Sequence, residues 1–162
     1  MVNPTTEQQG GAESRLAKLG IQLPSAPSPL GSYVETVQTG RLLFLSGMLP
    51  VIDHKPAYIG RLGRDLDAKT GREAARVAAL NALAAMEIHL GSLDRVKRVI
   101  RLAVFMATAG DFSADPGVAD GASDLLRDVF GLESMAVRSV IGVQSLPLGV
   151  PIELELTFEV EE

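Results

Sequence analysis

Residues 136–160 read AVRSVIGVQSLPLGVPIELELTFEV, and this stretch decides the fold class of the chain. From Ile152 to Val160, apolar residues alternate with glutamate and threonine, which predicts a strand with one buried face and one wetter face. The segment 136–143 predicts another strand, and Leu146-Pro147-Leu148-Gly149 predicts the turn between the two. The chain is therefore expected to end in a pair of strands.

Two helices are predicted upstream of this pair, separated by a long strand over 95–108. The first helix begins at Thr70-Gly71-Arg72-Glu73, which fits a capping box, and it ends at Gly91. The second begins at Asp115-Pro116, a side-chain cap followed by proline in the first turn, and it ends at Gly131.

The first third of the chain predicts less regular structure. Residues 33–39 and 42–46 form a hairpin signal around Thr39-Gly40, and the run LLFLS predicts a strand in the middle of a sheet. An edge strand is expected near 57–62. Residues 1–27 are expected to form a flexible tail and a short helix at 12–19, ahead of a single domain over 28–162.

The predicted order of elements is β-β-(β)-α-β-α-β-β, which is typical of an α+β protein. Two helices and five or six strands suggest one mixed sheet with both helices packed on one face. Because no third layer is available, the other face needs cover, and oligomerisation would supply it.

Composition excludes several classes of function. The chain has no cysteine and only two histidines, His54 and His89, so no disulfide, thiolate or transition-metal site is expected. The net charge is −5 and no basic run occurs, which argues against nucleic-acid binding. No signal peptide and no apolar run long enough to span a membrane is visible, so a cytoplasmic location without membrane partners is expected.

Two charged residues on predicted strands are candidates for chemistry. Arg138 lies in an apolar strand, where it either pairs with a neighbouring strand or subunit or binds a carboxylate with both guanidinium nitrogens. Glu153 shares a face with Glu155 and Glu159, which is either a solvated face or a site at which Glu153 activates a water molecule.

The closing stretch, with Arg138, Leu146-Pro147 and Ile152-Glu153, resembles the closing signature of the RidA/YjgF family. Upstream, LGSYVETVQTGRLLFLSGMLP resembles the opening hairpin of the same family. The resemblance implies a chorismate-mutase-like fold, a homotrimer with a central β-barrel, and ligand clefts between subunits. It also implies cofactor-free hydrolysis of reactive 2-imino acids, such as 2-iminopropanoate, to 2-oxo acids and ammonia.

The same resemblance assigns roles to residues at matching positions. Arg138 would bind the carboxylate of a small anionic metabolite, and Glu153 would orient or activate the attacking water. The remaining substrate-binding residues would be Tyr33, Ser46, Gly47 and Asp120.

The chain departs from the archetypes of the family at three positions. Asp120 lies where they have asparagine, and a carboxylate there would repel an anionic substrate unless it is paired or protonated. Ser32 and Met48 replace a proline and a glutamine. The stretches GASDLL and LPLGVPIELELTFEV resemble a longer subgroup of the family. Two alternatives therefore stay open: a non-catalytic or regulatory trimer that binds small carboxylates, and a hydrolase of another small carbonyl compound. A third, endoribonuclease activity, is disfavoured by the acidic charge and the scarcity of aromatic residues.

Overall fold

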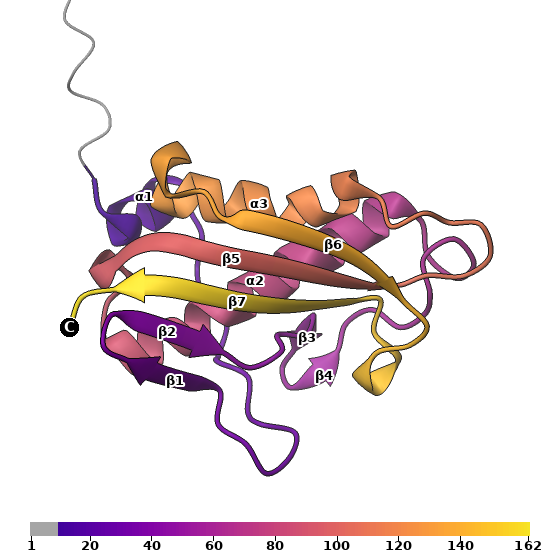
Figure 1. The fold of residues 1–162 in the computed structure, drawn as a ribbon, viewed down its shortest axis with the longest axis horizontal. Coiled ribbons are helices and arrows are strands. Elements are labelled where there is room, and N and C mark those ends of the chain that lie inside the picture. The colour runs from indigo at the N-terminus through magenta and orange to yellow at the C-terminus, as the bar shows by residue number, and fades with distance from the viewer. Residues whose placement is uncertain (1–9) are drawn as a thin grey trace, which may run out of the picture.

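The computed structural model describes residues 10–162, which form a five-stranded mixed sheet backed by helices (Figure 1). The strands lie in the order β1-β2-β7-β5-β6; β5 and β6 are parallel, and the other neighbours are antiparallel. The elements are α1 (Ala12–Lys18), β1 (Thr36–Thr39), β2 (Leu42–Leu45), β3 (Val51–Ile52), β4 (Lys55–Pro56), α2 (Ala68–Leu90), β5 (Val96–Ala107), α3 (Pro116–Phe130), β6 (Val137–Val143) and β7 (Ile152–Val160), with three short 3₁₀ turns at Leu93–Arg95, Leu132–Ser134 and Pro147–Gly149.

Both long helices cover the same face of the sheet, as the sequence predicts. In Figure 1, α2 and α3 lie together behind β5, β6 and β7. Along β7 the apolar side chains alternate inward against them: Ile152, Leu154, Leu156, Phe158 and Val160 are each at most 1% exposed. The apolar residues that alternate along the closing stretch are therefore the ones that face the helices and form part of the core.

The start of α2 corrects one prediction. The helix begins at Ala68 rather than Thr70, and its cap is Asp67, whose carboxylate accepts a hydrogen bond from the Thr70 amide at 2.8 Å. Thr70 lies inside the first turn because the aspartate three residues earlier already satisfies its free amide. The end of α2 is as predicted, with Gly91 in the left-handed conformation.

Helix α3 begins as predicted, with the Asp115 carboxylate accepting a hydrogen bond from the Gly117 amide at 2.7 Å. It packs closely on α2 at Gly121. A Cβ atom at this position would overlap the carbonyl oxygen of Arg72, so glycine permits the two helix backbones to touch. This contact sets how closely α3 packs beside α2.

The segment between β2 and α2 differs from expectation. The prediction of an edge strand near 57–62 is wrong. The strands in this segment are β3 and β4, each two residues long, and they pair with each other in a separate hairpin. Asp53 and His54 at its turn both have positive φ, as hairpins of this size require. The first strand begins at Thr36 rather than Tyr33, and residues 28–35 are loop.

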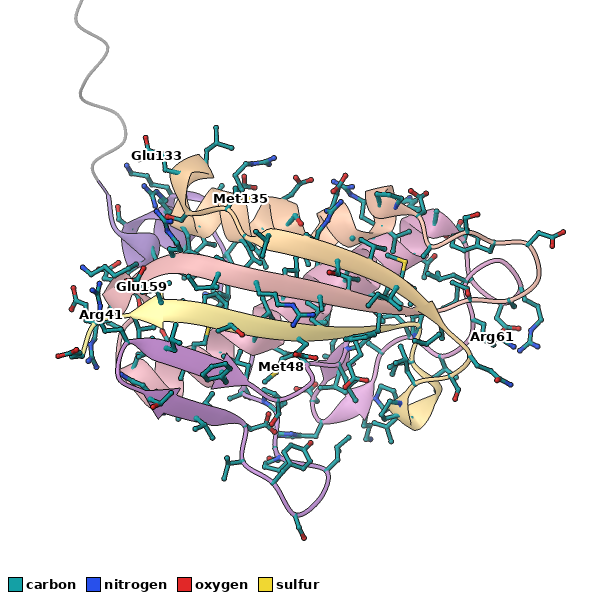
Figure 2. The ribbon with its side chains drawn as sticks, viewed as in Figure 1. Arg41, Met48, Arg61, Glu133, Met135 and Glu159 are labelled. Atoms are coloured by element: carbon teal, nitrogen blue, oxygen red, sulfur yellow. The ribbon has the colours of Figure 1, made fainter. Side chains whose placement is uncertain are left out.

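The sheet face opposite the helices is open and carries large apolar side chains. Strand β2 does lie inside the sheet, as predicted, but only Leu43 and Leu45 are buried, whereas Leu42 and Phe44 point to the open face. The exposed apolar residues on this face are Val37, Leu42, Phe44, Val137 and Ile141. Figure 2 shows one end of this face, where Arg41 and Glu159 form an ion pair at 2.8 Å.

No helix within residues 10–162 has the length and apolar character that crossing a bilayer demands.

Candidate functional site

A β-bulge at the end of β2 shapes the candidate site. Phe44 pairs with Thr157, and Met48 pairs with Leu154, so the three residues 45–47 at the end of β2 lie opposite two residues of β7. The Met48–Leu154 bridge is secured by hydrogen bonds of 2.8 and 2.9 Å. In Figure 2, Met48 lies where β2 gives way to the small β3–β4 hairpin. Bulges redirect side chains and are common beside active sites, and this one brings Gly47 against Glu153.

A cleft opens over this bulge, and we call it the Glu153 cleft. Its volume is about 370 Å³, and its walls include Leu30, Tyr33, Ser46, Gly47, Pro147 and Glu153. The walls come from three separate segments of the chain: the loop before β1, the β2 bulge, and the β6–β7 connection together with β7. The cleft therefore exists only because the sheet aligns β7 beside β2.

The Glu153 carboxylate is the acidic group among the side chains that line the cleft. Glu153 is half-buried on β7 and points away from the helices. Burial raises the pKa of its carboxyl group, and repulsion from Glu155 on the same face raises the pKa further. A carboxylate with a raised pKa is a better proton acceptor, which suits it to take a proton from water.

Gly47 is required by the position of this carboxylate. A Cβ atom on Gly47 would overlap Oε1 of Glu153, whereas the backbone of Gly47 is in a conformation open to any residue. We therefore expect Gly47→Ala to fold normally but to push the carboxylate aside. A displacement of about 1 Å at a reactive group can cost roughly 100-fold in rate, so any activity of the cleft should fall by about that factor while the melting temperature changes little. Unchanged activity in this variant would show that the position of Glu153 is unimportant.

Tyr33 and Ser46 hold the walls of the cleft through the backbone. The Tyr33 hydroxyl accepts a hydrogen bond from the Leu30 amide at 2.9 Å, which ties the loop before β1 into a turn. The Ser46 hydroxyl donates to the Val34 carbonyl at 2.6 Å, and the Ser46 amide donates to the Glu35 carbonyl. Both residues line the cleft, and both also fix its shape.

Arg138 and Asp120 lie elsewhere, at the opposite edge of the sheet. Arg138 pairs with Leu102 in the β5–β6 register and faces α3, where its Nη1 atom donates to Asp120 at 2.6 Å and to Ser123 Oγ at 3.0 Å. Within one chain Arg138 is thus engaged in an ion pair, but its partner lies on α3 rather than on the neighbouring strand or subunit that the sequence suggested. Its side chain remains 26% exposed at the edge strand β6, so it is within reach of another molecule.

The six residues expected at the site therefore form two groups in one chain. Tyr33, Ser46, Gly47 and Glu153 meet in the Glu153 cleft, and Arg138 meets Asp120 beside α3. Sequence reasoning missed Leu30 and Pro147 as cleft walls and Ser123 as a partner of Arg138. Pro147 had a signal in the LPLG turn; Leu30 and Ser123 had none, because only the fold brings them to these positions.

Neither histidine lies in the Glu153 cleft. His89, at the end of α2, contacts Thr36 Oγ1 at 3.2 Å and Gln38 Oε1 at 3.0 Å, and so links the helix to β1. His54 is exposed in the turn between β3 and β4. Over the described part of the chain, no group of three or more histidine, aspartate or glutamate side chains could hold a metal ion.

Comparison with known proteins assigns this fold to a class. Residues 13–158 match the family model described as "YjgF/chorismate_mutase-like, putative endoribonuclease". A crystal structure from Shewanella oneidensis superposes with a TM-score of 0.88 at 33% identity, covering 93% of this chain and all of that one. The molecule is thus an α+β protein of the YjgF/chorismate-mutase-like class.

Two relatives of known sequence support a more specific family assignment. Protein TCP17 of Trypanosoma cruzi is 41% identical over 151 residues, which cover 93% of this chain and 94% of the relative. A 2-iminobutanoate/2-iminopropanoate deaminase of Dermatophagoides farinae is 29% identical over 143 residues, which cover 87% of this chain and 95% of that protein. The chain belongs to the RidA/YjgF family.

Proposed function

We propose that this protein is a hydrolytic deaminase that converts reactive 2-imino acids to 2-oxo acids and ammonia. The observation that carries the proposal is the Glu153 carboxylate, held against Gly47 in a cleft large enough for a small metabolite. A relative spanning most of the chain bears the name of such a deaminase. An imine carbon is already electrophilic, so a positioned carboxylate and water supply the chemistry without a cofactor.

The reaction needs one water molecule and no oxidant. Water adds to the carbon of the protonated imine while Glu153 accepts one of the two water protons, which gives a neutral tetrahedral carbinolamine. Glu153 then passes this proton to the nitrogen, the carbon–nitrogen bond breaks, and the hydroxyl gives its own proton to the departing ammonia as it becomes the carbonyl of the 2-oxo acid. Ammonium leaves, and Glu153 is again a carboxylate.

The proposal includes a homotrimer whose sheets form a central barrel. The open sheet face carries Val37, Phe44 and Val137 in contact with solvent, and such apolar faces mark association surfaces. The separation of the two residue groups supports the same arrangement, because an anionic substrate beside Glu153 needs a cation, and within residues 10–162 no arginine or lysine lines the cleft. Arg138 of a neighbouring copy, on an exposed edge strand, would supply it.

The direct test follows imine decay with semicarbazide as the trap, using 2-iminopropanoate generated in situ by an amino-acid oxidase. We expect Arg138→Ala to lower kcat/KM by roughly 10- to 100-fold for each charged hydrogen bond lost. Asp120→Asn is the matched variant: it keeps the shape of the partner but releases the guanidinium, so KM should fall or stay unchanged. Equal activity of Arg138→Ala and wild type, in trimers of equal stability, would make Arg138 structural only.

Mixed trimers test which subunit supplies each group. Arg138→Ala and Glu153→Gln subunits should both be nearly inactive alone. If one cleft combines Glu153 of one copy with Arg138 of its neighbour, refolding the two together restores about one cleft in four by random assortment. Absence of any recovery would place both groups in one subunit or remove Arg138 from the site.

The Arg138–Asp120 ion pair also favours a second candidate, a trimer that binds small ligands without turnover. An arginine already neutralised by an aspartate attracts an anion less strongly. This candidate predicts saturable binding of 2-oxo acids with no acceleration of imine decay.

A further inference from the structure

A second cavity adjoins the Glu153 cleft, and we call it the side cavity. It has a volume of about 320 Å³, within the range of roughly 300–1,000 Å³ typical of small-molecule sites. It shares Leu30, Tyr33, Gly47 and Leu49 with the Glu153 cleft, so the two spaces meet beside the carboxylate.

The side cavity is mainly apolar. Its walls include Pro27, Pro29, Leu30, Met48, Leu49 and Val51, with Glu35 and His54 among its polar members. The prolines belong to the segment between α1 and β1, and their fixed φ angles hold this wall extended. The Tyr33–Leu30 hydrogen bond fastens the end of the same wall.

The floor of the cavity is rigid because α2 holds it. Asn81 is only 1% exposed, and its side-chain amide donates to the carbonyls of Leu49 and Val51 at 2.8 and 2.9 Å. Breaking these bonds would leave buried polar groups without partners, which is costly. The apolar space is therefore preformed, which lowers the cost of filling it.

We propose that the side cavity is a subsite for an apolar substituent of the substrate, so that the protein prefers imines of large apolar amino acids to imines of alanine size. This inference rests on the proposed function. A substrate whose imine carbon lies in the cleft beside the Glu153 carboxylate extends its substituent past Gly47 into the side cavity. A methyl group leaves the cavity to water, whereas an isobutyl or thioether chain displaces that water.

The test compares imines made in situ by D-amino-acid oxidase from D-alanine, D-leucine and D-methionine. A single methylene in a hydrophobic pocket changes kcat/KM by roughly 10-fold or more. We therefore expect the leucine and methionine imines to be hydrolysed with kcat/KM at least about 10-fold above that of the alanine imine. Equal values for the three imines would overturn the subsite and leave the deaminase intact.

Substitutions at two neighbouring residues test whether the side cavity causes the preference for large apolar substituents. Val51 lines the side cavity, whereas Ile52 on the same short strand is 51% exposed and does not line it. Val51→Trp should fill the cavity and lower the leucine-to-alanine ratio of kcat/KM at least about fivefold, because the isobutyl group loses its space. Ile52→Trp should leave that ratio unchanged. A ratio that both variants or neither variant alters would overturn the assignment.

Binding of stable products separates this inference from the proposed function. Calorimetry should show 4-methyl-2-oxopentanoate binding at least about 10-fold more tightly than pyruvate, and Val51→Trp should remove the difference. Such a preference without turnover of any imine would support the subsite and overturn the deaminase. Turnover of the alanine imine with no preference for larger substituents in binding or hydrolysis would support the deaminase and overturn the subsite.

Discussion

Glu153→Gln should abolish most imine hydrolysis and leave the fold intact. Glutamine keeps the shape of the side chain and its fit against Gly47, but it cannot accept a proton from water. Loss of a general base typically lowers the rate by about 10²- to 10⁴-fold, so kcat for the preferred imine should fall within that range. Single-turnover trapping of the 2-oxo acid measures the loss without interference from product release.

Glu155→Gln is the matched control. Glu155 lies two residues away on the same sheet face, is more exposed than Glu153, and does not line the cleft. Its removal should lower the pKa of Glu153 by relieving repulsion, with little effect on kcat at neutral pH. If Glu155→Gln lost as much activity as Glu153→Gln, the general charge of the face would matter rather than one carboxylate.

The pH dependence gives a second readout for Glu153. Its pKa is raised above the ordinary value of 4.5 by burial and by Glu155, so activity should fall as pH drops through this raised pKa. A carboxyl group with a raised pKa binds its proton more tightly in the folded state, so it stabilises the fold at low pH and loses this contribution as pH rises. Glu153→Gln should therefore be at least as stable as wild type at neutral pH, and a clear loss of stability would indicate a structural role.

Phe158→Ala should remove a large part of the stability of the domain. Phe158 is fully buried on β7, and its ring meets that of Phe130 of α3 edge-to-face at a centroid distance of 6.0 Å. Truncation of a buried phenylalanine costs about 3–5 kcal/mol because it removes apolar burial and leaves a cavity. Against a typical total of about 5–15 kcal/mol, urea unfolding should show a much lower midpoint with a similar slope.

Phe44→Ala is the comparison for this prediction. Phe44 is 42% exposed on the open face of the neighbouring strand, so its truncation should cost an isolated chain much less. In a trimer that buries this face between subunits, the same substitution should weaken assembly of the trimer. Analytical ultracentrifugation measures this loss of assembly separately from unfolding. A cost for Phe158→Ala no greater than that for Phe44→Ala would contradict the arrangement of the core.

The sequence predicted much of the fold because short patterns of apolar and capping residues indicate which side chains are buried and where helices begin and end. The alternation in 152–160, the cap at Asp115-Pro116 and the stop at Gly91 each depend on a few neighbouring residues, and each is found in the structure. Predictions failed where a competing local group was overlooked, as with Asp67 ahead of Thr70. They also failed in 57–62, where no repeating pattern specified a pairing partner.

The sequence by itself determined the order of the main strands and helices along the chain and the helix boundaries to within a few residues, and it singled out Arg138 and Glu153 as candidate site residues. Only the tertiary structure decided that Gly47 touches the carboxylate of Glu153, that Leu30 and Pro147 wall the same cleft, and that Arg138 faces α3 and pairs with Asp120. The physical reason is that these contacts join segments remote in the chain. Their geometry depends on the register of β2 against β7 and on the approach of α3 to β6, which short-range sequence patterns do not encode.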